Sequence, residues 1–125
     1  NGPSRYKIMM KIEIAKQFSA YPAGRFSPSD GEFSGESFRK IHLVPVLTEA
    51  IAKGAEIHVS LDGVRTFGSS FLEEAFGGLV RKEHFSKKDI EKHLVIDFSN
   101  SSLEMYRDAI WEYIRKAKSE DSKDK

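Results

Sequence analysis

The stretch Leu61-Asp62-Gly63-Val64-Arg65-Thr66-Phe67-Gly68-Ser69-Ser70-Phe71-Leu72-Glu73-Glu74 decides how this chain is interpreted. Apolar residues alternate up to Leu61, which predicts a strand, and the Asp62-Gly63 pair that follows predicts a turn. From Ser70 onward the apolar residues recur at helical spacing, so a helix is expected there. Ser69 and Ser70 therefore stand at a helix start, where unpaired N–H groups and partial positive charge favour a cap or an anion.

The two serines leave three interpretations open. Ser70 and Glu73 have the spacing of a capping box, in which Ser70 caps the helix and Ser69 only precedes it. Alternatively, Ser69 is phosphorylated and the added charge faces the unpaired N–H groups. The third interpretation is that the same helix start binds a small anion.

Length and composition predict one soluble domain. The chain has 125 residues, and we expect a single domain over residues 1–118. Residues 1–5 are expected to be an expression-vector remnant or disordered. Residues 119–125 carry no apolar side chain and are predicted to form a disordered charged tail.

Charge and residue usage argue against several functional classes. The net charge is +1, so nucleic acid and membranes are not expected as partners. There is no cysteine, which suits the cytoplasm, and no signal peptide is apparent. The four histidines lack metal-binding spacing, so neither a metal nor another cofactor is expected. His58 alternates away from the apolar side of its strand and is predicted to lie at the surface.

The remaining pattern predicts an α/β fold. Strands are expected near residues 8–14, 57–61 and 94–98, with a weakly signalled short strand around Arg25 and Phe26. Ser34 is predicted to cap a helix that Pro45 kinks or divides and Gly54 ends. Its inward face is expected to comprise Phe38, Ile41, Val44, Leu47 and Ile51. A short helix capped at Ser86 and a last helix capped within residues 99–102 are also expected. The predicted fold is a small, mixed, mostly parallel sheet backed by helices.

Three blocks of the sequence resemble the STAS-like domain family of unknown function, relatives of the STAS domains of bacterial anti-sigma-factor antagonists. The blocks are Gly24-Arg25-Phe26 with Asp30-Gly31; Ser34-Gly35-Glu36-Ser37-Phe38-Arg39 with Leu43-Val44-Pro45; and Asp62-Gly63-Val64 with the run from Gly68 to Leu79. The resemblance covers roughly residues 25–79. It implies a STAS-like fold and a regulatory module that is not an enzyme.

The same resemblance implies a partner and a switch. In STAS antagonists a partner kinase phosphorylates the first serine of an Asp-Ser-Ser-Gly-Leu element, and this blocks binding to a kinase-like ATPase of the histidine-kinase superfamily. Ser69 takes the phospho-acceptor position and Ser70 follows it. Two positions depart from the motif, because Gly68 replaces the aspartate and Phe71 replaces the glycine.

Two arginines form a second candidate constellation. Arg25 and Arg39 can bind a carboxylate or phosphate through bidentate hydrogen bonds, and with the Ser34–Gly35 helix start they would complete an anion pocket. The simpler alternative pairs Arg25 with Asp30 to organise the loop. The residues proposed to bind a partner or an anion are Arg25, Asp30, Ser34, Arg39, Asp62, Gly68, Ser69, Ser70 and Glu73.

Two further functions are considered. One is a small-molecule or nucleotide sensor that uses Arg25, Arg39 and a helix N-terminus. The other, less favoured, is a serine-dependent hydrolase, since Asp62 and Asp97 both end strands and could lie near Ser69. The surrounding sequence is not Gly-x-Ser-x-Gly, and no histidine is placed beside Ser69 in the sequence.

Overall fold

A parallel sheet organises the computed structural model, which describes residues 8–120. Its strands are β1 (Met9–Glu13), β2 (Glu56–Ser60) and β3 (Leu94–Asp97), in the order β1-β2-β3. The predicted remnant at residues 1–5 and the end of the predicted tail, residues 121–125, lie outside the described residues. The described start of the predicted tail includes Ser119, whose Oγ lies 2.7 Å from His84 Nδ1.

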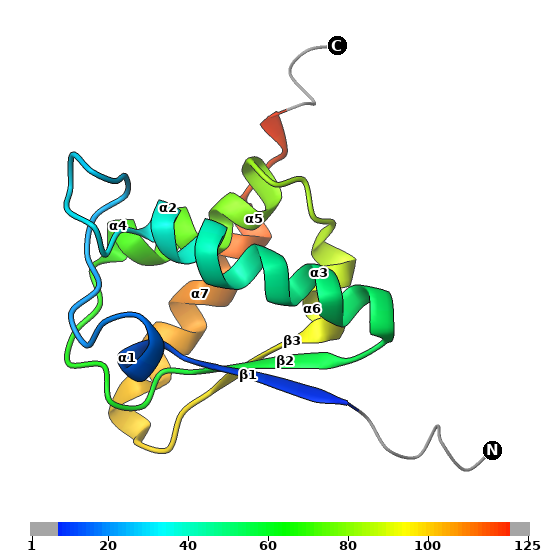
Figure 1. Ribbon diagram of the computed structural model, residues 1–125, viewed down its shortest axis with the longest axis horizontal. Coiled ribbons are helices and arrows are strands. Elements are labelled where there is room, and N and C mark those ends of the chain that lie inside the picture. Colours follow the sequence, from blue (N-terminus) through cyan, green and yellow to red (C-terminus); the bar gives the residue numbers. More distant parts are fainter. Residues whose placement is uncertain (1–7, 121–125) are drawn as a thin grey trace.

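Among residues 8–120, helices cover one face of this sheet and leave the other uncovered (Figure 1). Two crossovers of the same hand in a 1-2-3 strand order place both connections on one face. Ile12, Val59 and Ile96 face that side; they are neighbours in the strand register and are all buried. Lys11, His58 and Val95 occupy one row of the opposite face.

The predicted α/β fold is confirmed, with one difference in the sheet. We expected a mixed sheet, but every strand pair within residues 8–120 is parallel. Arg25 and Phe26 form no strand; they lie in a turn whose backbone N–H groups both donate to Asp30. The Asp30 carboxylate therefore takes the backbone N–H groups that a strand at this position would use for pairing.

The first connection is mostly helical. It comprises α1 (Ile14–Gln17), a long loop, α2 (Gly35–Phe38), the π-helical turn η2 (Arg39–Leu43) and α3 (Val44–Lys53). The side chain of Ser34 accepts a hydrogen bond from Ser37 N, and Gly54 ends α3 in the left-handed conformation at φ 67°, so both predicted ends are confirmed. Pro45 lies in the first turn of α3, directly after the π-helical turn, which is the division predicted near Val44.

The π-helical turn corrects the predicted inward face. Ile41 was expected inside, yet 63% of its surface is exposed. A π turn takes up one more residue than an α turn, so the face that contains Phe38 resumes five residues later, at Leu43. The buried apolar residues of this segment are Phe38, Leu43, Leu47 and Ala50.

The second connection contains another π-helical turn. It comprises α4 (Ser69–Leu72), η3 (Glu73–Gly77), α5 (Gly78–Arg81) and α6 (Lys87–His93). Ser86 caps α6 through a hydrogen bond from Asp89 N, as predicted. After β3 come the 3₁₀ turn η4 (Ser101–Leu103) and α7 (Glu104–Lys116), which packs on η3 and buries Ile110 and Ile114.

Candidate functional site

The predicted serine pair lies at an exposed helix start. α4 begins at Ser69, and Gly68 is its N-cap in an extended conformation with φ −78° and ψ 142°. Both serines are exposed, and within residues 8–120 neither hydroxyl makes a hydrogen bond. The pair is therefore accessible to another molecule.

The predicted capping box is not formed. Ser70 lies inside the helix, and the start of α4 has no side-chain cap. The carboxylate of Glu73, which the capping box would need, binds Arg25 Nη1 at 2.5 Å and Arg81 Nη1 at 2.7 Å. Burial alone would raise the pKa of Glu73, but the hydrogen bonds and charges of Arg81 and Arg25 hold it below its usual value. Two charged partners outcompete a single backbone N–H for this carboxylate.

A second part of this ion cluster is fully buried. Arg39 is 1% exposed and Glu74 is 2% exposed, and Arg39 Nη1 donates to Glu74 Oε2 at 2.9 Å and to Glu74 O at 2.6 Å. Arg39 Nε also donates to Glu83 Oε2 at 2.9 Å. The buried charges are thus paired and hydrogen-bonded, as charges in an apolar interior must be.

Three glycines make room for this cluster. A Cβ at Gly78 would overlap Nη1 of Arg39, and one at Gly77 would lie 2.8 Å from Glu73 Oε2. A Cβ at Gly35 would lie 2.6 Å from Phe71 O, so Gly35 allows α2 to approach α4 closely. The Gly77-Gly78 pair therefore serves close packing and does not end the helix, which continues to Arg81.

The arginines lie together, but they do not form the expected anion pocket. Arg25 is paired with Glu73 and approaches Glu74 at 3.4 Å, while Arg39 is buried between Glu74 and Glu83. Ser34 is fully buried, and its hydroxyl lies 2.7 Å from that of Ser27. Because glutamates already neutralise both guanidinium groups, this geometry gives the anion-sensor alternative no support.

Asp30 organises its loop differently from the predicted ion pair. Its Oδ2 accepts the backbone N–H groups of Arg25 and Phe26, each at 3.1 Å, while the guanidinium of Arg25 extends to η3. The loop backbone is further joined to α2, because Glu36 N donates to Arg25 O. Asp30 thus orients the backbone from which Arg25 reaches the helix.

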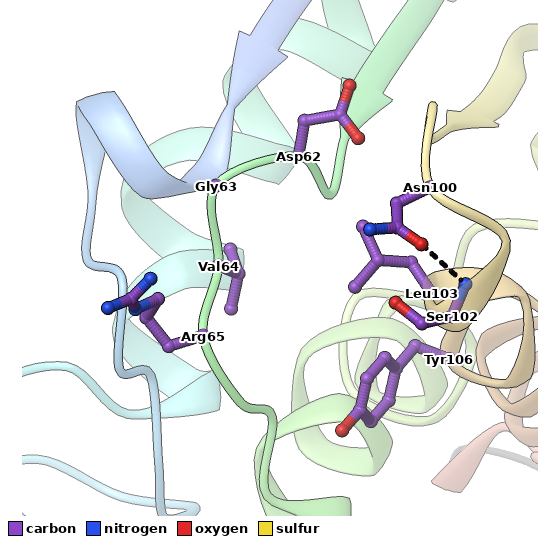
Figure 2. Close-up of a pocket in the computed structure, with 8 residues that line it drawn as sticks. All are labelled: Asp62, Gly63, Val64, Arg65, Asn100, Ser102, Leu103 and Tyr106. Carbon is purple, nitrogen blue, oxygen red and sulfur yellow. Dashed lines mark hydrogen bonds between the residues drawn. The ribbon is translucent and has the colours of Figure 1, made fainter.

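Asp62 lies at a different site, a pocket of about 370 Å³ at the carboxyl ends of β2 and β3 (Figure 2). The pocket is lined by Asp62, Gly63, Val64, Arg65, Asn100, Ser102, Leu103 and Tyr106. The carboxylate of Asp62 accepts hydrogen bonds from Ser99 N at 2.8 Å and Ser99 Oγ at 2.7 Å. These bonds lower the pKa of Asp62, so it is ionised at neutral pH. Asp62 lies two residues beyond the end of β2, in the predicted Asp-Gly turn, with Gly63 at φ 89°.

The histidines and Asp97 do not complete a catalytic triad around Ser69. His58 Nδ1 lies 2.8 Å from Asp97 Oδ2 and its Nε2 lies 3.1 Å from Glu56, on the helix-free face of the sheet. The predicted surface position of His58 is only partly right, since its neighbours leave 16% of its side chain exposed. Among residues 8–120 no histidine is hydrogen-bonded to Ser69, so the hydrolase alternative has no geometric support.

Sequence reasoning missed two features of this region. The loop after α1 exposes three aromatic side chains: Tyr21 at 62%, Phe33 at 41% and Phe26 at 40%. The pocket residues contributed by the β3 side, Asn100, Ser102 and Tyr106, were also missed. A signal for the second feature was present, because residues 99–102 form a polar turn directly after a strand end, where α/β proteins often bind ligands.

The family model of the STAS-like domain of unknown function matches residues 34–103, more than half of the chain. The chain therefore belongs to this family, and the recognition made from the sequence is confirmed. The match begins at Ser34 and includes the serine pair and Asp62, whereas Arg25 and Asp30 precede it. No curated protein and no solved structure matches the chain. Within residues 8–120 no helix is both long and apolar enough to cross a bilayer.

Proposed function

We propose that this domain is a non-enzymatic regulatory module that binds another protein, and that phosphorylation of Ser69 switches this binding. The observation that carries the proposal is the exposed serine pair, whose hydroxyls the fold does not use within residues 8–120. The chain belongs to a STAS-like domain family of unknown function. The resemblance of its sequence to the STAS domains of anti-sigma-factor antagonists favours a kinase-like ATPase of the histidine-kinase superfamily as the partner.

The proposed contact surface extends from the serines to the aromatic loop. Arg65 N donates to Ala20 O, and the Cα of Ala23 lies 4.0 Å from the position that a Cβ on Gly68 would take. The loop therefore runs beside the segment that leads into α4, as Figure 1 also shows. Tyr21 belongs to this loop and is exposed, and aromatic residues are enriched in protein interfaces.

Phosphorylation would alter this surface electrostatically. The Oγ of Ser69 would form a bond to the γ-phosphorus of ATP, the bond from that phosphorus to the β-phosphate oxygen would break, and ADP would leave. The hydroxyl proton would pass to a base of the kinase. The new group would bring a charge of about −1.5 to −2 to the contact surface at neutral pH.

Unlike a free anion, a phosphoryl group on Ser69 would be held covalently beside Glu73, and we expect Arg25 to exchange its pairing with Glu73 for that group. Ser69 and Glu73 are four residues apart, so their side chains are neighbours on one helical face. Arg25, which binds Glu73, has 39% of its side chain exposed, and Arg81 would still neutralise Glu73 if Arg25 moved to the phosphoryl group.

Phe71, which replaces the glycine of the STAS-antagonist motif, has a structural role, because its ring is fully buried and lies 5.8 Å from the ring of Phe38.

The proposal is tested by affinity purification of tagged variants from the native host, followed by mass spectrometry. We expect a kinase-like ATPase to co-purify with wild type and with Ser69→Ala, and to be lost with Ser69→Asp. Tyr21→Ser should weaken capture, whereas Met105→Ser, which changes a 67% exposed residue on α7, should not. Equal capture by Ser69→Ala and Ser69→Asp would refute the switch, and capture of no ATPase by any variant would refute the partner class.

A further inference from the structure

Hydrogen bonds hold together the two walls of the pocket at the carboxyl ends of β2 and β3. Asp62 connects the two loops that make its walls, through its two hydrogen bonds from Ser99. On the second wall, Asn100 Oδ1 accepts a hydrogen bond from Ser102 N at 2.9 Å. On the first wall, Val64 N donates to Leu61 O and closes the turn that contains Gly63. A ligand would therefore lose little affinity to the ordering of these loops.

The pocket contains polar groups with unused hydrogen-bonding capacity. The amide of Asn100 uses its oxygen for the helix cap, so its nitrogen keeps two N–H donors. Within residues 8–120 the hydroxyls of Ser102 and Tyr106 make no hydrogen bond. Each oxygen of Asp62 accepts one bond from Ser99 and can accept another.

The polar groups at the pocket favour an uncharged ligand. Figure 2 shows the Arg65 side chain directed away from the other pocket residues, so no guanidinium faces an anion there. An anionic ligand would instead meet the ionised carboxylate of Asp62. A cationic ligand that carries only donors would pair with Asp62 but would leave the N–H donors of Asn100 without an acceptor. An uncharged ligand that both donates and accepts hydrogen bonds satisfies both groups.

We propose that this pocket binds the vicinal diol of an uncharged sugar, either a free sugar or the ribose of a nucleoside. Asp62 and Asn100 line the same end of the pocket (Figure 2). A hydroxyl group there donates its proton to the Asp62 carboxylate and accepts an N–H from Asn100. Val64 and Leu103 contact the less polar face of the sugar. A volume of about 370 Å³ lies in the range of small-molecule sites, about 300–1,000 Å³. This site is separate from the serine pair, and neither proposal depends on the other.

The test is a titration of the ¹⁵N-labelled full chain, followed by amide chemical shifts, with D-ribose, adenosine and 2′,3′-dideoxyadenosine as probes. We expect saturable shifts at Gly63, Val64 and Leu103 with adenosine or ribose, and none with the dideoxy compound, which lacks the diol. Binding of ribose alone as tightly as adenosine identifies the free sugar, whereas tighter binding of adenosine identifies a nucleoside. An equal response to the dideoxy compound, or no saturable shift at these amides, overturns the proposal.

Matched variants separate recognition from loop structure. Asn100→Asp retains an oxygen that accepts from Ser102 N but removes both N–H donors, so binding should weaken at least tenfold. Asp62→Asn keeps an acceptor for Ser99 and should weaken binding similarly, because the strong carboxylate acceptor is lost. Ser101→Ala changes an adjacent residue outside the pocket and should leave binding unchanged. Wild-type affinity in both Asn100→Asp and Asp62→Asn would show that these residues do not recognise the ligand.

Discussion

The buried pair of Arg39 and Glu74 gives the sharpest stability prediction. Arg39→Met removes the guanidinium but retains an apolar chain of similar length beside Gly78. Glu74, 2% exposed, then loses its 2.9 Å partner, and its carbonyl oxygen loses a 2.6 Å donor. Removing one member of a buried ion pair costs about 3–5 kcal/mol. We expect the lower end of this range here, because Arg25 and Arg81 remain 3.4 Å from the Glu74 carboxylate. For a domain of this size such a loss lowers the melting temperature by about 10 °C or more.

Urea denaturation followed by circular dichroism measures this loss, and two further variants interpret it. Arg25→Met removes a 39% exposed arginine whose partner keeps Arg81, so it should cost no more than about 1 kcal/mol. The double variant Arg39→Met/Glu74→Met should be more stable than Arg39→Met alone, because no charge is left buried at Glu74. If Arg39→Met cost no more than Arg25→Met, the argument from burial would be wrong.

Two other predictions follow from the sheet and from the helix contact. Burial lowers the pKa of His58, but the hydrogen bonds and charges of Asp97 and Glu56 outweigh burial and raise this pKa overall. The protonated His58 therefore stabilises the fold fully below about pH 6.5, and this stabilisation is lost as the pH rises through the folded-state pKa. Wild type should therefore lose its stability advantage over His58→Gln between pH 6 and pH 9 in thermal melts, and a constant difference would contradict this assignment. Gly35→Ala should cost about 1–3 kcal/mol in urea denaturation, since its Cβ would lie 2.6 Å from Phe71 O. Gly68→Ala, whose Cβ would approach no atom closer than 4.0 Å, serves as its control and should cost less.

The parts of the fold that follow from local chemistry were predictable from the sequence. Alternation identified β1 and β2, and Ser34 and Ser86 cap the helices that they were predicted to cap. Gly54 ends α3 for the reason expected of a glycine, its left-handed conformation. Each of these signals depends on residues within one or two helical turns of one another.

The errors arose where distant residues decide the outcome. Ile41 was placed inside because α-helical spacing was assumed, and one additional residue in the π-helical turn η2 moved it to the surface. Glu73 was assigned to a capping box from its spacing to Ser70. Its actual partner, Arg25, is 48 residues away in the sequence, so local spacing could not identify it. No local pattern identifies such partners, since they meet only when the loop, α2 and η3 pack together. For the same reason, local patterns did not predict that Asn100, Ser102 and Tyr106 line the pocket beside Asp62.

The ion cluster also clarifies where function should be sought. Arg39, Glu74 and Gly78 all belong to the sequence blocks that resemble the STAS-like family. Each has a structural role that needs no ligand, because Arg39 and Glu74 form a buried ion pair and Gly78 leaves space for the Arg39 guanidinium. Ser69 and Ser70 have no such role, because the helix starts without their hydroxyls and solvent reaches both. Substituting either serine with alanine should therefore change stability little. A loss of partner binding in Ser69→Asp, at unchanged stability, would then be attributable to the contact surface and not to the fold.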